Sequence, residues 1–164
     1  MPGKRTLYAS AGVRRIRYDE VESLLSRDMR LQFVDPGIVF GRIHIESAVL
    51  HAIRAFKHGK NTCRELRTEI LLYLSGERQI STAIKVAGIK RDADRCVMII
   101  LRPEKGEPDS LIRKMKWVRD DTILSPEGKD LSKLGISRIE TRSADPPEDL
   151  VLERVALVDI LKGS

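Results

Sequence analysis

The 164-residue sequence is poor in aromatic side chains, cysteine and long apolar runs. Aromatic residues make up 4% of the chain, which disfavours a broad platform for stacking RNA bases and predicts an aliphatic core. Cys63 and Cys96 lack a second cysteine or a histidine at metal-ligand spacing, so both are expected to be reduced core residues. No signal peptide, transit peptide or apolar run of about 18 residues is present. We therefore expect a cytoplasmic protein with no membrane partner.

The motifs of common catalytic and cofactor sites are also absent. The chain has no Gly-x-Gly-x-x-Gly loop, nucleophile elbow or His-Glu-x-x-His pair, and Lys60 is followed by asparagine where a P-loop needs serine or threonine. The adjacent Asp120 and Asp121 resemble a loop tip more than an acid/base dyad, because neighbours along a strand point to opposite faces. These absences favour a binding or regulatory protein with no catalytic residue and no cofactor.

Three histidines, His44, His51 and His58, recur at a spacing of seven residues on one predicted helix. Seven helical residues rise about 10 Å, so two of these rings cannot share one metal ion, and no metal site is predicted. The row is interpreted as satisfied histidines at the edge of the core, or as a contact with RNA or a protein partner. An alternative function stays open, that of an RNA-processing enzyme with His44 or His51 as general base.

Positive charge is concentrated in the first half of the chain. The formal net charge is +6, and it divides into +7 for residues 1–90 and −1 for residues 91–164. Such a field is compatible with binding a polyanion such as RNA. Arg14, Arg15 and Arg17 follow one another near the start, and we interpret them as a solvated face of a strand or as phosphate contacts.

The hydrophobic pattern predicts a single α+β domain over residues 1–164, with a small mixed sheet of about four strands packed with several helices. Residues 1–12 are expected to be partly loose. Strands are expected at 13–18, 31–34, 96–101 and within 117–124, and helices from 19, over 42–58, through 111–115, over 126–134 and over 148–161.

Residues 66–88 form the pattern of a helical hairpin. Each half is closed by a glycine, Gly76 or Gly88, which is expected to take the left-handed conformation. Thr62 and Glu65 match a capping box for the first helix. The turn between the two helices carries Arg78 and Gln79, whose donors and acceptor a hairpin does not need for its own folding.

This hairpin carries a family resemblance. The segments Glu69-Ile70-Leu71, Ser75-Gly76, Arg78-Gln79-Ile80, Ala83-Ile84 and Gly88 resemble the central signature of the archaeal kinase-binding small subunit of the KEOPS complex, the family of the p53-related-kinase-binding protein. The helix with His44, Ala48 and Ala52 and the ending Val151-Leu-Glu-Arg-Val-Ala-Leu157 are also similar. Residues 103–144 fit the family pattern only loosely.

The resemblance implies a non-catalytic subunit of the complex that installs N6-threonylcarbamoyl on adenosine 37 of tRNA. Its partners would be the small atypical kinase/ATPase of KEOPS, tRNA held by its 3′ CCA end and, indirectly, the other KEOPS subunits. The kinase contact is then expected at Val86, Ala87 and Ile89, where simple core packing is the alternative. The CCA end is expected at Arg78 and Gln79, helped by Lys57, Lys60 and Lys85, since arginine can stack on an unpaired base and glutamine can read a base edge.

Overall fold

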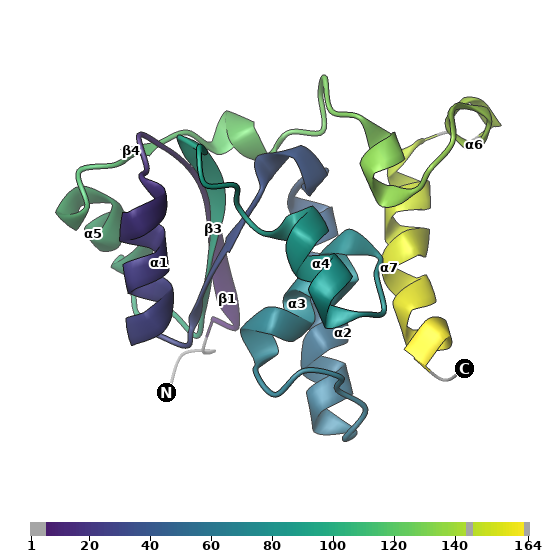
Figure 1. The fold of residues 1–164 in the computed structure, drawn as a ribbon, viewed down its shortest axis with the longest axis horizontal. Coiled ribbons are helices and arrows are strands. Elements are labelled where there is room, and N and C mark those ends of the chain that lie inside the picture. Colours follow the sequence, from purple (N-terminus) through teal and green to yellow (C-terminus); the bar gives the residue numbers. More distant parts are fainter. Residues whose placement is uncertain (1–5, 144–145, 163–164) are drawn as a thin grey trace.

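Four strands form one sheet in the computed structural model, which describes residues 6–143 and 146–162. The order across the sheet is β2-β3-β1-β4 (Figure 1). The strands are β1 (Tyr8–Arg14), β2 (Leu31–Val34), β3 (Arg95–Leu101) and β4 (Val118–Arg119). The α+β class is confirmed, but every strand pair is antiparallel, so the expectation of a mixed sheet is wrong.

Strand β3 is the centre of the sheet. It pairs with β1 along its whole length, from Tyr8 opposite Leu101 to Arg14 opposite Arg95, and with β2 on its other side. Its residues from Cys96 to Leu101 are all buried, which confirms the predicted buried central strand. The bounds predicted for β2, 31–34, also agree with the structure.

Strand β1 lies earlier in the chain than predicted. It spans Tyr8–Arg14, and the left-handed backbone of Arg15, with φ 63°, ends it. Residues 8–12 are therefore ordered strand and not a loose segment. The sequence hid this strand because its small residues lack an alternating pattern. One of them is required by packing, since a Cβ on Gly12 would lie 2.1 Å from the carbonyl oxygen of Asp120.

Helices cover both faces of the sheet (Figure 1). One face carries α1 (Tyr18–Arg27) and α5 (Glu107–Lys114). On the other side lie α2 (Arg42–Lys57), α3 (Leu66–Ser75), α4 (Ile80–Ala87) and, beyond them, the C-terminal helix α7 (Glu148–Lys162). Helix α7 packs against α2 and α3, and no helix within the described residues is long and apolar enough to cross a membrane.

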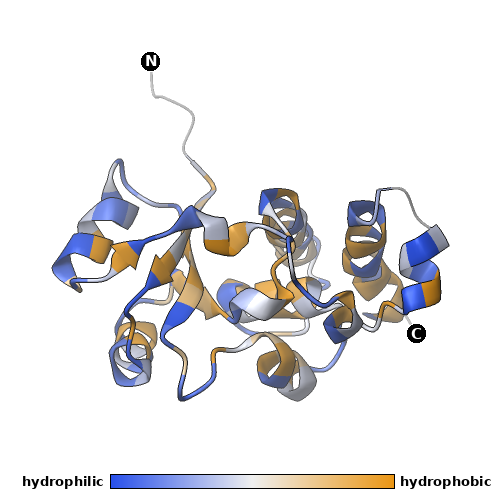
Figure 2. Cartoon of the chain, turned by 90° about the horizontal axis from the view of Figure 1, so that it is seen from above, coloured by the Kyte–Doolittle hydropathy of each residue, from blue (hydrophilic) through white to orange (hydrophobic). Residues whose placement is uncertain are grey.

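Alternate residues of β3 feed two separate cores, as the pleat of a strand requires. Val97, Ile99 and Leu101 join the core beneath α2, α3 and α7. Cys96, Met98 and Ile100 join the core beneath α1 and α5. Figure 2 shows apolar residues on the central strands and on one side of each large helix. Cys63 and Cys96 are free and buried, as predicted.

The connection from β4 to α7 is less helical than predicted. In place of a helix over 126–134 it contains the 3-10 helices η2 (Asp121–Leu124) and η3 (Leu131–Leu134), followed by the short α6 (Arg138–Ser143). Gly135 does end η3 in the left-handed conformation, with φ 72°. A third 3-10 turn, η1 (Pro36–Ile38), follows β2 at the predicted Asp-Pro-Gly turn.

Asp120 and Asp121 are structural anchors and not the tip of a loop. The N–H of Asp120 donates to the carbonyl of Gly12 at 2.8 Å, and the N–H of Gly12 donates to the Asp121 carboxylate at 3.1 Å. Asp120 also pairs with Arg14 at 3.1 Å. Arg15 and Arg17 are exposed, in agreement with a solvated face.

Candidate nucleic-acid and partner-binding surfaces

The turn between α3 and α4 is built on Ser75 and Gly76. Gly76 has φ 72°, which confirms the left-handed end predicted for α3. The buried Ser75 hydroxyl donates to the Leu72 carbonyl at 3.1 Å and accepts from the Glu77 N–H at 3.3 Å. These bonds satisfy backbone groups at the helix end and fix the direction in which the chain leaves α3. The turn is thus a defined structure that presents the next residues outward.

Gly88 behaves differently from Gly76. Its φ of −69° and ψ of 151° are extended values, so the predicted left-handed conformation is wrong. Glycine is needed there for space, because a Cβ would lie 2.5 Å from the carbonyl oxygen of Ile84. The close approach lets the chain leave α4 and form a bridge to Val34 at the edge of the sheet.

Arg78 and Gln79 lie exposed in the turn between α3 and α4. Gln79 is the N-cap of α4, but its side chain makes no capping bond. Within the part of the chain that the structure describes, neither side chain has a hydrogen-bond partner, so all of their donors are open to a ligand. Lys85 is exposed on α4, and its carbonyl accepts from Lys90 at 2.6 Å.

The loop between α2 and α3 is held by a buried carboxylate. Glu69 has no exposed surface, and it accepts from the N–H groups of Thr62, at 3.0 Å, and Cys63, at 2.8 Å. The predicted capping box of Thr62 and Glu65 is therefore wrong: Glu65 is the N-cap of α3, but its side chain makes no capping bond and accepts from Arg67 at 2.7 Å instead. The acceptor for the Thr62 N–H is Glu69, which lies one helical turn after Glu65.

Lys162 of α7 completes this buried cluster. Its ammonium donates to Glu69 and, at 2.9 Å, to the hydroxyl of Tyr73, and it lies 4.4 Å from the centre of the Tyr73 ring. Burial by itself would raise the pKa of Glu69, but the bonds from Lys162 and from the backbone outweigh it and hold that pKa below its usual value. The last turn of α7 is thereby fixed to α3 and to the loop.

A second short network reaches α2. Asp159 accepts from the hydroxyl of Tyr73 and contacts Nδ1 of His51 at 2.7 Å. Burial favours the neutral acid, yet the bonds from Tyr73 and His51 keep the pKa of Asp159 below its usual range. His51 is thus occupied by a structural contact between α2 and α7.

A cationic cavity opens beside these networks. It has a volume of about 540 Å³ and lies between the ends of α2 and α7. Asp159 and Lys162 already form hydrogen bonds to side chains of the protein. The donors that remain open to a ligand therefore belong to Arg54, His58 and Lys60. Lys60 was expected to assist RNA binding and His58 belonged to the histidine row, for which an RNA contact stayed open, whereas Arg54, four residues before His58 on the same helix face, was missed. The cavity is lined by Arg54, Ala55, His58, Lys60, Asp159 and Lys162.

The five predicted RNA residues are all exposed and fall into two groups. Lys57 is the last residue of α2 and Lys60 lines the cationic cavity just beyond it, whereas Arg78, Gln79 and Lys85 lie on the turn and on α4. The turn begins beside α7, because a Cβ on Gly76 would lie 3.6 Å from Cβ of Arg154, and α2 and α4 pack over the same core. The structure therefore places them on one side of the sheet, although their part in RNA binding stays a prediction.

His44 is a satisfied core histidine. Its side chain is 1% exposed, Nδ1 accepts from the Phe40 N–H at 3.1 Å, and Nε2 lies 3.1 Å from the Leu74 carbonyl, to which it must donate. Burial lowers its pKa to about 4. Both ring nitrogens are in use and unreachable by a substrate, which does not fit a general base. Among the described residues, no group of three or more potential ligands could hold a metal ion.

The predicted kinase residues differ in their exposure. Val86 and Ile89 are partly buried and pack against the two cores, and Ala87 has no exposed surface, so Ala87 cannot touch a partner in this fold. Helix α4 packs through its alanines and turns its larger residues outward: Ile80 is 37% exposed and Ile84 is 49% exposed. Spacing alone does not separate these isoleucines from the alanines, because a short helix offers few positions to distinguish its sides.

An apolar groove runs beside the exposed side of α4. Its volume is about 240 Å³, and it is lined by Ile84 and Ile89 together with residues of α1, β2 and α3, among them Tyr18 and Leu25. Exposed isoleucine next to an apolar groove is typical of surfaces that receive a protein partner.

Comparison with known proteins gives matches over most of the chain. The family described as "Kinase binding protein CGI-121" matches residues 17–159. The chain is 28% identical over 155 residues to "Regulatory protein Cgi121" of Methanocaldococcus jannaschii, covering 92% of this chain and 97% of that protein. It is 43% identical over 56 residues to "KEOPS complex subunit Cgi121" of Pyrococcus abyssi, covering 33% of each chain.

Proposed function

The chain belongs to the kinase binding protein CGI-121 family, and from this membership we propose that it is the kinase-binding, regulatory subunit of a KEOPS-type complex. The observation that carries the proposal is the extent of the match, which includes residues 17–159 and so spans the elements from α1 to α7. The names of the two relatives, one a regulatory protein and one a KEOPS complex subunit, support the same assignment.

The proposed kinase contact is the outward side of α4. Ile80 and Ile84 are exposed apolar residues four apart, and the groove lined by Ile84 and Ile89 continues their surface. Burying such side chains against a partner is the main source of affinity in protein interfaces. Val86 is partly buried against the core beneath α2 and α3 and is not among the residues that line this groove.

The kinase contact is tested by co-purification with the kinase. Ile84→Glu should abolish binding because it places a charge in an apolar contact, while thermal unfolding stays cooperative because the side chain is 49% exposed. Ile43→Glu on α2 is the matched control, since Ile43 is also an exposed isoleucine, at 61%. Loss of binding in the control, with Ile84→Glu normal, would show that the contact lies on α2.

The second part of the proposed function is recruitment of tRNA through its 3′ CCA end. It is supported by open cationic donors at the cavity, where Arg54 and Lys60 meet, and by the unpartnered Arg78 and Gln79 in the nearby turn. Single-stranded RNA ends are bound by stacking on arginine or aromatic planes, by contacts to base edges and by cations that follow the phosphates. The protein would thereby serve the modification of adenosine 37 without an active site of its own.

Binding is measured for full tRNA and for tRNA without its CCA end, each at several salt concentrations. The full tRNA should bind more tightly, and affinity should fall with salt because phosphate contacts release counterions. Arg78→Ala should weaken binding about tenfold or more, the effect of one stacked base, and should leave the truncated tRNA unaffected. Equal affinity for the two RNAs would refute the CCA end as the bound element.

The enzymatic alternative is tested with the same tRNA. His51 is the candidate general base that remains, since His44 is buried, but its Nδ1 is engaged by Asp159. We expect the isolated protein to leave tRNA unchanged. Cleavage or modification by the protein alone, abolished by His51→Ala, would replace the binding proposal with a catalytic one.

A further inference from the structure

The outward side of α2 carries exposed apolar side chains that neither proposed contact uses. Ile43 is 61% exposed and Leu50 is 39% exposed, whereas Ala48 and Ala52 on the inner side are fully buried. Ile43 and Leu50 are seven residues apart and so lie on one line along the helix. A shallow groove of about 390 Å³ follows this line between α2 and α7, and Leu152 of α7 joins the two residues in its lining. An exposed apolar face of this kind is typical of a contact with another protein chain.

Two opposite charges lie at equal distances from Leu50 on the same face. Glu46 precedes it by four residues, Arg54 follows it by four, and both are exposed. Eight residues of helix rise about 12 Å, so these two charges cannot pair with each other. Arg42, one turn before Glu46, is already paired with Asp121 at 3.1 Å. Among the described residues, neither Glu46 nor Arg54 has a side-chain hydrogen bond or ion pair, so both are available to a second molecule.

We propose that two copies of this chain associate through α2 in antiparallel orientation, with a two-fold axis beside Leu50. Such an axis places Glu46 of each copy beside Arg54 of the other, so the pattern of one chain supplies two ion pairs. Leu50 meets its counterpart at the axis, and Ile43 lies along the aliphatic part of Lys57 of the second copy. A parallel pair of helices would instead bring like charges together. The charge pattern therefore selects a second, antiparallel copy as the occupant of this face.

The size of the contact makes this a weak dimer. Helix α2 has 16 residues and is about 24 Å long. One helix with the adjoining groove offers less than the roughly 800 Å² per partner of a standard interface, and contacts of that smaller size are typical of transient complexes. We therefore expect a Kd on the order of 10–100 μM for the pair.

Arg54 belongs both to this face and to the cationic cavity, since it lines the groove and the cavity. RNA in the cavity and a second copy on α2 would therefore draw on the same guanidinium. The dimer does not rest on the RNA proposal, because its ion pairs and its apolar contact are formed by protein alone.

The first test is sedimentation equilibrium of the full chain, from tenfold below to tenfold above the expected Kd. The average mass should rise from that of one chain towards that of two. Glu46→Arg should raise the Kd about tenfold or more, because the symmetry turns two attractions into two repulsions. Arg54→Glu should act in the same way. Both positions are exposed, so thermal unfolding of each variant should stay cooperative.

The double variant Glu46→Arg with Arg54→Glu exchanges the two charges and restores both pairs. Its Kd should return to within about threefold of the parent value, as expected for residues that act on each other. Ile84→Glu on α4 is the control and should leave the Kd unchanged. A parent chain that stays a single copy throughout, a double variant as weak as the single ones, or dissociation by Ile84→Glu would each overturn the proposal.

Oxidative cross-linking tests the position of the axis. Leu50→Cys should form a disulfide between copies, because its two Cα atoms face each other at about 5 Å across the axis. Ile43→Cys is the matched control: it lies seven residues from the axis, so its two copies are about 20 Å apart and should not be linked. The native Cys63 and Cys96 are buried and do not compete. Linkage of both variants would indicate a parallel pair, and any result other than linkage of Leu50→Cys alone overturns the proposal.

Discussion

The face of the sheet beneath α1 and α5 is packed with apolar side chains such as Phe33, Met98 and Ile100. The face beneath α2, α3 and α7 differs, because the four buried polar residues of the described chain, Gln32, His44, Glu69 and Ser75, lie on that side. Buried polar groups are costly unless they are hydrogen bonded, and each of these four is.

Two of these polar residues hold a segment that carries candidate RNA contacts. Glu69 binds the backbone of the loop that follows Lys60, and Ser75 fixes the turn before Arg78. His44 joins Phe40, two residues before α2, to the end of α3. The apolar face supplies stability without such constraints, so the comparison indicates that one face holds the fold and the other also positions the proposed site.

The largest effect is expected on the apolar face. Phe33 is 1% exposed and meets Trp117 edge to face, with ring centres 5.9 Å apart. Phe33→Ala should reduce the free energy of unfolding by about 3–5 kcal/mol, the usual cost of removing a buried ring. Urea unfolding measures this change. At low urea, where the variant is still folded, it should bind tRNA as tightly as the parent chain. A loss of tRNA affinity as large as the loss of stability would show that the apolar face also positions the proposed site.

Acid should act on the polar face through His44. The folded-state pKa of about 4 lies below the unfolded value of 6.5, so the stabilising contribution of neutral His44 is complete above pH 6.5 and is lost as the pH falls through 4. The loss at pH 4 is about 3 kcal/mol. Urea unfolding from pH 7 to pH 4 should be less pH-dependent in His44→Gln, which cannot take up the proton. Equal pH dependence would mean that His44 does not titrate in this way.

Periodicity predicted the elements whose apolar residues repeat clearly. Strands β2 and β3 and helices α2 and α7 were all expected within a few residues of their observed bounds. Strand β1 was displaced because Gly12 is dictated by the approach of Asp120 from a distant part of the chain. Local sequence cannot reveal a constraint of that kind.

In the candidate site, too, local sequence revealed some residues, and contacts between distant parts of the chain determined the others. Arg78 and Gln79 were singled out by their residue types in a turn, and Lys60 by what the family resemblance implies. The buried Glu69 was not, because its partner Lys162 lies 93 residues away and reaches it only when α7 packs on α3. The inward turn of Ala87 likewise depends on how closely α4 approaches the core, which its spacing does not show.

Glu69→Gln sharpens the comparison by removing a charge without changing shape. It should lower the free energy of unfolding by about 2 kcal/mol, since hydrogen bonds to a charged group are the stronger ones and Lys162 loses its counterion. Amide hydrogen exchange at Thr62 and Cys63 should speed up, and tRNA affinity should fall with it. Unchanged exchange in the loop would show that Glu69 does not position it.

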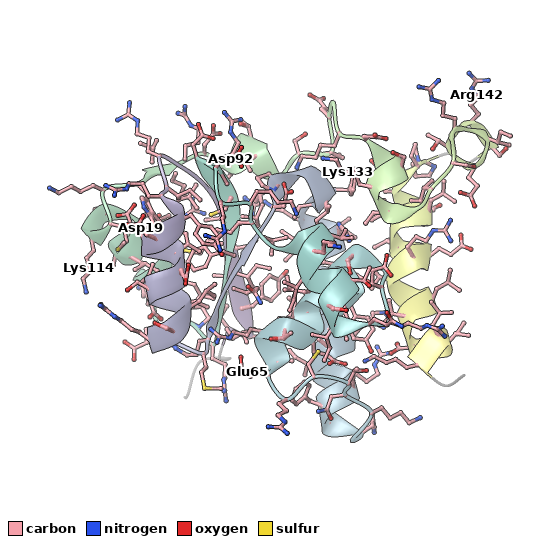
Figure 3. The ribbon with its side chains drawn as sticks, in the orientation of Figure 1. Asp19, Glu65, Asp92, Lys114, Lys133 and Arg142 are labelled. Carbon is pink, nitrogen blue, oxygen red and sulfur yellow. The ribbon has the colours of Figure 1, made fainter. Side chains whose placement is uncertain are left out.

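The smallest effect on stability is expected at the surface, where Lys60→Ala can be set against Lys114→Ala. Both side chains are exposed, but Lys60 lines the cationic cavity and Lys114 lies on α5 across the sheet (Figure 3). Neither change should alter the free energy of unfolding by more than about 0.5 kcal/mol. Lys60→Ala should reduce the slope of log affinity for tRNA against log salt by about 0.7, which is the value for one phosphate contact on a single strand. Lys114→Ala should leave this slope unchanged. Equal slopes for the two variants would place the RNA elsewhere, because the polar face would then confer no advantage over the apolar one.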